Sequence, residues 1–310
     1  MITNEFISNP PFPTFTQFET GTACNAKCRM CPHPKMTRKG TAKWSLIAKI
    51  IREAAPKSGS ICPFLLQEPM LEPRLFSILA NIKQNTPACQ TVVYSNMGKL
   101  HPEIERIIKY ELLDELHISF YGPTEELHKK WQQGLNYKQT VRNIKKIKRL
   151  KKKHTVTKPV TTLHILDVPE ITALISSYPL LRDVDQSTLV QYDTFHGDVP
   201  DYGGQQFAKI VGAPAERTPC QRLWTGLNIH FDGSVVPCCI DWRDQNVLGN
   251  VTGQTLKEVW ESPKFQQFRK LHVEGKWDTI PMCRDCKVHE YQTNKEWTEY
   301  WKKQLVTLTC

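Results

Sequence analysis

The chain has 310 residues, of which 40% are hydrophobic and 23% charged, a balance that excludes wholesale disorder and leaves room for one large domain or a medium domain with a small one. Its net charge of +10 comes almost entirely from residues 142–158, which hold nine Lys or Arg and no acid. No apolar run is long enough to span a membrane and the first residues lack a secretory signal, so we expect a cytoplasmic protein with no membrane partner. Eleven cysteines in such a protein point to metal or redox chemistry rather than to disulfide bonds.

Strand and helix patterns alternate through the first two-thirds of the chain. Short apolar or alternating runs predict strands at 14–19, 62–66, 91–94, 116–120, 160–166 and 187–192. Helical spacing predicts helices at 44–54, 73–82, 103–112 and 169–176, and a further helix over the basic segment. This alternation predicts βαβ units and a parallel sheet, and six such units would close most of a (β/α) barrel, for which eight are needed.

The basic segment itself carries apolar residues at helical spacing, namely Val141, Ile144, Ile147 and Leu150. The pattern favours an amphipathic helix whose basic face is solvated. A patch for a phosphate, a nucleic acid or an acidic peptide is the alternative. Because no aromatic residues alternate with the lysines, we expect no nucleic-acid partner.

The pattern changes after residue 195. Residues 196–219 are rich in Gly and Pro and are predicted to be a linker. Asp232-Gly233 between two apolar runs predicts a hairpin, residues 255–271 one helix, and residues 291–310 a helical tail. We therefore expect an α/β protein in which a partial barrel at 14–195 precedes a small α+β domain at 220–290.

Three cysteines stand in the run CNAKCRMC, just after the first predicted strand. Cys24, Cys28 and Cys31 would also fit one face of a helix, so three buried small hydrophobes are the alternative interpretation. Gly21 before the run and Pro32 after it favour a loop wrapped around a bound group. Three thiolates can hold three irons of a [4Fe–4S] cube and leave the fourth iron open.

A second group of cysteines follows the predicted linker: Cys220, Cys238, Cys239, Cys283 and Cys286. Their pattern is Cys-x12-Gly-x4-Cys across the predicted hairpin and then, after a gap, Cys-x2-Cys. Four thiolates also suit zinc, so a zinc ribbon is the alternative, although a ribbon usually has two Cys-x2-Cys pairs.

The Cys-x3-Cys-x2-Cys loop after a first strand resembles that of the radical S-adenosylmethionine (radical SAM) superfamily. In that family the open iron binds SAM, reductive cleavage of SAM yields a 5′-deoxyadenosyl radical, and the radical takes a hydrogen atom from the substrate. The resemblance implies a partial (β/α)6-like barrel in which Cys24, Cys28 and Cys31 hold the SAM-binding cluster. It also implies a low-potential reductant such as flavodoxin or ferredoxin.

Four polar residues match the places where this family binds SAM. Glu68, at the end of the second predicted strand, matches the acid of a Gly-Gly-Glu motif that contacts the SAM amino group, although the glycines are absent. Ser95 and Asn96 match a Thr-Asn-Gly turn, and Ser119 matches a strand residue that meets the ribose. Ordinary polarity at strand ends is the alternative for each.

The second cysteine group, with the runs DGSVVPCCIDW and LKEVWESPKFQQFR, resembles the C-terminal SPASM/twitch domain of radical SAM enzymes. Only one later cysteine is present, so the resemblance implies the shorter twitch form with one auxiliary [4Fe–4S] cluster on Cys220, Cys238, Cys283 and Cys286. The expected cofactors are thus two [4Fe–4S] clusters and SAM.

Cys239 is left over in this assignment. Because adjacent residues on a strand point to opposite faces, we expect Cys239 to face away from a cluster that Cys238 faces. Cys239 is a candidate hydrogen donor to a substrate radical, and a buried space-filling residue is the alternative.

The resemblance leaves the substrate open between a small molecule and a peptide. One-cluster twitch domains resemble those of antibiotic-pathway enzymes that oxidise an alcohol, so we expect dehydrogenation or epimerisation of a sugar or aminocyclitol. A maturase of a ribosomally synthesised peptide, forming an epimer or a crosslink, is the alternative. It ranks second because such enzymes usually carry a leader-binding module and only about 13 residues precede the first predicted strand. A non-enzymatic metal-binding protein is a remote third possibility.

Overall fold

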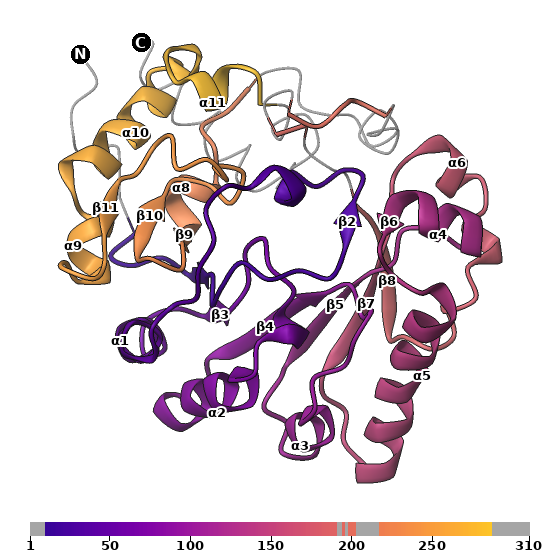
Figure 1. Cartoon of the computed structure of the whole chain (residues 1–310). Coiled ribbons are helices and arrows are strands. Elements are labelled where there is room, and N and C mark those ends of the chain that lie inside the picture. The colour runs from indigo at the N-terminus through magenta and orange to yellow at the C-terminus, as the bar shows by residue number, and fades with distance from the viewer. Residues whose placement is uncertain (1–9, 191–193, 196–197, 203–216, 287–310) are drawn as a thin grey trace.

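The computed structural model describes residues 10–190, 194–195, 198–202 and 217–286 (Figure 1). The strands are β1 (Phe15–Phe18), β2 (Lys27–Cys28), β3 (Ser60–Cys62), β4 (Gln90–Ser95), β5 (Glu115–Ser119), β6 (Gln132–Gln133), β7 (Val160–Leu166), β8 (Gln186–Val190), β9 (Gly226–Ile229), β10 (Ser234–Val236) and β11 (Gly249–Asn250). The α-helices are α1 (Trp44–Ala54), α2 (Leu75–Asn85), α3 (Ile104–Lys109), α4 (Glu125–Trp131), α5 (Tyr137–His154), α6 (Pro169–Thr172), α8 (Arg222–Thr225), α9 (Leu256–Trp260), α10 (Pro263–Val273) and α11 (Pro281–Arg284). The predicted linker lies mostly outside the described residues, and the predicted tail lies wholly outside them.

Parallel strands from the first two-thirds of the chain form one curved sheet in the order β1-β3-β4-β5-β7-β8. Their order in the sheet follows their order in the chain, as repeated βαβ units require. Helices α1, α2, α3 and α5 lie along the outer face of this sheet (Figure 1). The predicted α/β fold with a partial parallel barrel is therefore confirmed. Among the described residues, none of the helices has the length and apolar character needed to cross a membrane.

The predicted C-terminal hairpin forms and continues the same sheet. β9 pairs in parallel with β1, placing Phe18 opposite Ile229, and β10 and β11 then add antiparallel strands. Gly233 turns the chain with a φ of +87°, a conformation that glycine adopts without strain. The sequence did not reveal that this hairpin would be an added edge of the barrel sheet.

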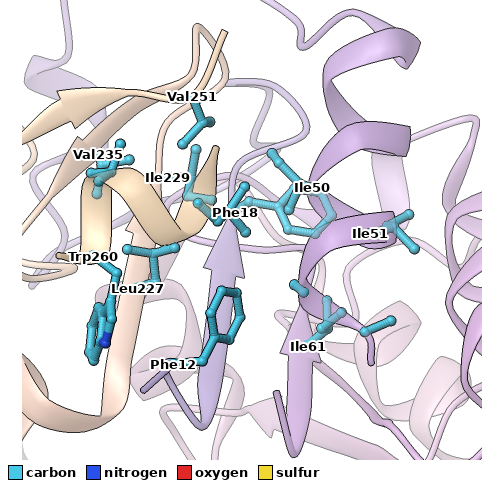
Figure 2. Close-up of a cluster of buried hydrophobic side chains, with 14 of the residues drawn as sticks. Phe12, Phe18, Ile50, Ile51, Ile61, Leu227, Ile229, Val235, Val251 and Trp260 are labelled. Carbon is cyan, nitrogen blue, oxygen red and sulfur yellow. The ribbon is translucent and has the colours of Figure 1, made fainter. Parts of the chain in front are cut away.

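A single hydrophobic cluster joins the barrel to the C-terminal segment (Figure 2). Phe18 of β1 and Ile50 of α1 pack in it with Leu227 and Ile229 of β9 and Trp260 of α9. The Trp260 indole is fully buried and its Nε1 donates to the Pro10 carbonyl at 2.8 Å. Replacing a buried Trp with Ala typically lowers the free energy of unfolding by about 3–5 kcal/mol. The packing of Trp260 therefore contributes strongly to holding the C-terminal segment against the barrel sheet.

Three predicted elements differ from the structure. The helix predicted at 169–176 is the short helix α6 (Pro169–Thr172) followed by a separate 3₁₀ turn, Ile175–Ser177. The helix predicted at 255–271 is two helices, because Ser262 caps α10 through its hydroxyl (3.3 Å to the Phe265 N–H) and Pro263 occupies the first helical position. The strand predicted at 62–66 ends at Cys62, so Glu68 follows a loop and precedes the short 3₁₀ turn Pro69–Leu71 instead of ending the strand.

The predicted basic helix is α5, which begins at Tyr137 because the Asn136 side chain caps the Gln139 N–H at 2.9 Å. Its apolar stripe is buried against the sheet. Acidic side chains of neighbouring elements pair with part of its basic face, including Asp185 with Lys151 at 2.7 Å. These contacts favour a solvated helix face over a binding patch.

Candidate active site

A pocket of about 530 Å³ opens at the carboxyl ends of the first parallel strands, a volume typical of small-molecule sites. Its wall combines the first cysteine loop, the strand ends and the edge of the C-terminal hairpin. Nine of its lining residues are Cys24, Cys28, Cys31, Glu68, Ser95, Asn96, Ser119, Arg222 and Cys239. The fold therefore brings the three thiols, the four predicted SAM contacts and Cys239 into one cavity.

The first cysteine run is a loop, as its flanking residues predicted. Within it the two-residue strand β2 pairs with β6, so Cys28 lies opposite Gln132. The Cys31 N–H donates to the Cys28 carbonyl at 3.0 Å, and the Ala26 N–H approaches the Cys24 Sγ at 3.5 Å. The loop thus turns its three thiols toward the pocket instead of burying them on a helix stripe.

Electrostatics around these thiols fits an iron–sulfur cluster. Burial is the largest cause of the raised pKa of Cys28, and the charges of Cys31, Cys24 and Glu68 raise this pKa further. Burial also raises the pKa of Cys31 to about 12, with a further contribution from Cys24. Three thiolates that disfavour one another need a strongly positive partner, which the irons of a cluster supply.

The Glu68 side chain is 3% exposed and is held by three donors. Its Oε1 accepts from the Ser95 hydroxyl at 2.7 Å and from the Met70 N–H at 3.0 Å, while Oε2 accepts from the Asn96 N–H at 2.8 Å. The Asn96 side chain in turn donates to the Asn25 side chain at 2.9 Å, which connects this group to the cysteine loop. The structure therefore assembles three of the four predicted SAM contacts into one hydrogen-bonded unit.

Ser119, the fourth predicted contact, lies at the end of β5 and is fixed by Gln132. The Gln132 Nε2 donates to the Ser119 carbonyl at 2.9 Å, and the Tyr121 N–H donates to the Gln132 Oε1 at 2.8 Å. The Ser119 hydroxyl is hydrogen-bonded to the Tyr121 phenol. Gln132 and Tyr121 also line the pocket, and no spacing signal in the sequence pointed to either.

The second cysteine group brings together thiols from three places in the chain: Cys220 just before α8, Cys238 just after β10, and Cys283 and Cys286 at α11. Burial raises the pKa of Cys283, and the charges of Cys220, Cys238 and Cys286 raise it further. In the part of the chain that the structure describes, no three His, Cys, Asp or Glu side chains are close enough to hold a single metal ion. The charge effects among these thiols place them near one another, as either a four-iron cluster or a zinc site requires.

The structure corrects the argument from strand alternation for Cys238 and Cys239. β10 ends at Val236, so both cysteines follow the strand and its alternation does not apply to them. Arg222 Nη1 contacts both thiols, at 3.2 Å from the Cys238 Sγ and 2.9 Å from the Cys239 Sγ. The two thiols still differ in their surroundings. Cys239 lines the pocket, whereas Cys238 is close enough to Cys220 for its charge to raise the pKa of that thiol.

Comparison with known proteins places this geometry in a family. Residues 18–170 match the Radical SAM superfamily, and residues 220–287 match SPASM, an iron-sulfur cluster-binding domain. The S-adenosyl-L-methionine-dependent 2-deoxy-scyllo-inosamine dehydrogenase of Niallia circulans is 32% identical over 286 residues, which cover 91% of this chain and 95% of that protein. The chain belongs to the radical SAM superfamily. The cofactors of this radical SAM enzyme are SAM and two [4Fe–4S] clusters.

Solved structures share the fold of this radical SAM enzyme. BtrN in complex with AdoMet and 2-DOIA matches with a TM-score of 0.62 at 16% identity, covering 89% of this chain and 93% of BtrN. Streptococcus suis SuiB bound to the precursor peptide SuiA matches with a TM-score of 0.69 at 12% identity, covering 91% of this chain and 71% of SuiB. These likenesses show a shared fold over most of this chain.

Proposed function

We propose that this radical SAM enzyme oxidises an alcohol group of a polar small molecule, of the sugar or aminocyclitol class, by two electrons. The observation that carries the proposal is the shared pocket, in which the thiols of the first loop face Arg222 and Cys239 at the edge of the second cysteine group. Removal of a hydrogen atom from an alcohol carbon leaves one more electron to remove, and an auxiliary cluster beside the pocket can accept it. The dehydrogenase relative, similar over nearly its whole length, supports this class of reaction.

We assign each residue of the site a role in this reaction. Cys24, Cys28 and Cys31 hold the SAM-binding cluster, and Glu68 binds the SAM ammonium while Ser95 and Asn96 orient its carboxylate. Ser119 is placed for the ribose, and the auxiliary cluster is held by Cys220, Cys238, Cys283 and Cys286. When bound, SAM and its cluster supply a radical that takes a hydrogen atom from the substrate. A low-potential donor such as flavodoxin or ferredoxin supplies the electron for SAM cleavage.

The pocket wall suits a polar ring. Gln17 of β1 and Asn228 of β9 lie opposite each other in the sheet register and both line the pocket. Their amides can donate to and accept from the hydroxyl and amino groups of an aminocyclitol. Phe15 and Phe64 offer apolar surface beside them. Such a mixture of a few polar groups with aromatic walls fixes the orientation of a small substrate.

The test uses candidate aminocyclitols and amino sugars deuterated at the alcohol carbon, incubated anaerobically with SAM and a reductant. We expect a product two hydrogens lighter than its unlabelled substrate and transfer of the deuterium into 5′-deoxyadenosine. A product of unchanged mass that acquires deuterium from D₂O would indicate epimerisation instead. Modification of a precursor peptide without turnover of any small molecule would favour the peptide maturase.

A further inference from the structure

Arg222, the first residue of α8, lies between the pocket and the second cysteine group. Its Nη1 donates to the Cys238 Sγ at 3.2 Å and to the Cys239 Sγ at 2.9 Å. The same side chain lines the pocket that the three thiols of the first loop face. One guanidinium therefore contacts a proposed ligand of the auxiliary cluster and also borders the space proposed for the substrate.

The charge on this guanidinium is permanent. A guanidinium is not deprotonated in proteins, so Arg222 stays cationic beside the Cys238 and Cys239 thiols. The second cysteine group is thus built around a cation, whereas the first stands beside the carboxylate of Glu68.

This difference bears on which cluster accepts electrons readily. A [4Fe–4S] cluster on four thiolates carries a charge of about −2 when oxidised and about −3 when reduced. A cation that donates a hydrogen bond to a ligand sulfur favours the more negative state, and the effect is large where water is excluded. Other arginines of this region are used differently: Arg217 donates to the Cys283 carbonyl and Arg269 to the Leu223 and Trp260 carbonyls.

We infer that Arg222 is a positioning residue that raises the reduction potential of the auxiliary cluster, which the proposed function already takes as the electron acceptor. The inference rests on the proposed function. In the balanced step, the radical takes one hydrogen atom from the alcohol carbon, the hydroxyl proton passes to water, and the remaining electron passes to the oxidised auxiliary cluster as the carbonyl forms. An oxidised flavodoxin or ferredoxin would then take up this electron, which would restore the oxidised state of the cluster held by Cys220, Cys238, Cys283 and Cys286.

The test isolates the auxiliary cluster by replacing Cys24, Cys28 and Cys31 with Ala and reconstituting the second cluster anaerobically. The midpoint potential is then measured by a redox titration followed by electron paramagnetic resonance, in this background and with Arg222→Gln or Arg222→Lys added. Arg284→Gln is the matched control, because Arg284 lies between Cys283 and Cys286 in sequence but its side chain is 57% exposed. Its charge is therefore screened by solvent.

We expect Arg222→Gln to make reduction of the cluster at least tenfold less favourable, which corresponds to a shift of about 59 mV to a more negative potential for one electron. Arg222→Lys should shift the potential in the same direction by less, and Arg284→Gln should shift it little. An unchanged potential in an iron-loaded Arg222→Gln protein would overturn the inference.

Two further outcomes separate this inference from the proposed function. If Arg222→Gln loses its iron, Arg222→Lys decides, and a potential equal to that of the parent protein would then overturn the inference. If the parent protein itself forms no second cluster, the result rejects the assignment of the auxiliary cluster to Cys220, Cys238, Cys283 and Cys286, and the inference on Arg222 falls with it. Formation of the cluster with no effect of Arg222 leaves that assignment standing and rejects the inference alone.

Discussion

The Ser95 hydroxyl donates a hydrogen bond of 2.7 Å to the Glu68 carboxylate, linking the end of β4 to the loop that follows β3. Burial raises the pKa of Glu68 to about 7, while the N–H of Asn96, the Ser95 hydroxyl and the N–H of Met70 act to lower it. The carboxylate is thus fixed in direction before any ligand arrives, and a cation placed against it would restore its charge.

Replacing this acid should weaken SAM binding without removing iron. A charge-assisted hydrogen bond is worth about 1.5–3 kcal/mol, so Glu68→Gln should lower SAM affinity about ten- to a hundred-fold. Ser95→Ala, which removes one of the three donors but keeps the carboxylate, should have a smaller effect. Equilibrium titration of the iron-loaded proteins with SAM measures both. Equal affinities in Glu68→Gln and the parent protein would place the ammonium contact elsewhere.

The first cysteine loop should account for half of the iron. With two four-iron clusters, the anaerobically prepared protein should hold about eight iron atoms per chain and an equal amount of sulfide. Replacing Cys24, Cys28 and Cys31 with Ala should reduce both by about half and abolish 5′-deoxyadenosine formation. Reductive SAM cleavage by that variant would show that the catalytic loop is misassigned. Abundant zinc without sulfide would return the second cysteine group to a zinc ribbon.

Cys239 distinguishes a dehydrogenase from an epimerase. A thiol in the pocket wall is placed to return a hydrogen atom to a substrate radical, which an epimerase needs and a dehydrogenase does not. We expect Cys239→Ala to keep most of the dehydrogenation, with no deuterium at carbon when the reaction runs in D₂O. Mass spectrometry of the product decides the question. A deuterated product from the parent enzyme that disappears in Cys239→Ala would show that this thiol is the hydrogen donor.

His128 should make the fold sensitive to acid. Its imidazole is fully buried beside the rings of Phe120 and Tyr137, and burial lowers its pKa to about 4. Histidine in an unfolded chain titrates near 6.5, so the unfolded state binds more protons between about pH 6.5 and pH 4. The free energy of unfolding should therefore decrease as pH falls through this window, by about 1–3 kcal/mol from this residue.

The measurement compares urea unfolding of the parent protein and His128→Phe at pH 7.5 and at pH 5. Phe retains the aromatic contacts but cannot take up a proton, so the variant should lose less stability than the parent on acidification. An equal loss in both proteins would show that other groups account for the acid sensitivity.

Much of the site could be predicted because its signals are local. A cluster needs thiols at short fixed spacings, so CNAKCRMC and the Cys-x2-Cys pair are visible in the sequence without any fold. The resemblance to the radical SAM superfamily assigned Glu68, Ser95, Asn96 and Ser119 to SAM, and they meet in one pocket because residues that follow parallel strands lie at one edge of a sheet. Strand and helix periodicity likewise indicated the partial barrel.

Other relationships depended on contacts between residues far apart in the chain. The pairing of β1 with β9, which sets Gln17 opposite Asn228, joins segments about 200 residues apart, and no periodicity records such a pairing. Arg222 had no motif of its own, and its place between the pocket and the second cysteine group follows only from how α8 packs. The strand-alternation argument for Cys239 failed for a related reason, because the end of β10 at Val236 is decided by sheet pairing and not by local propensity, although Cys239 does line the pocket. The spacing of the cysteines and the order of the strands can therefore be read from the sequence itself. The contact of Arg222 with the second cysteine group and the closure of the pocket by β9 depend on the packing of distant segments, which only the tertiary structure decides.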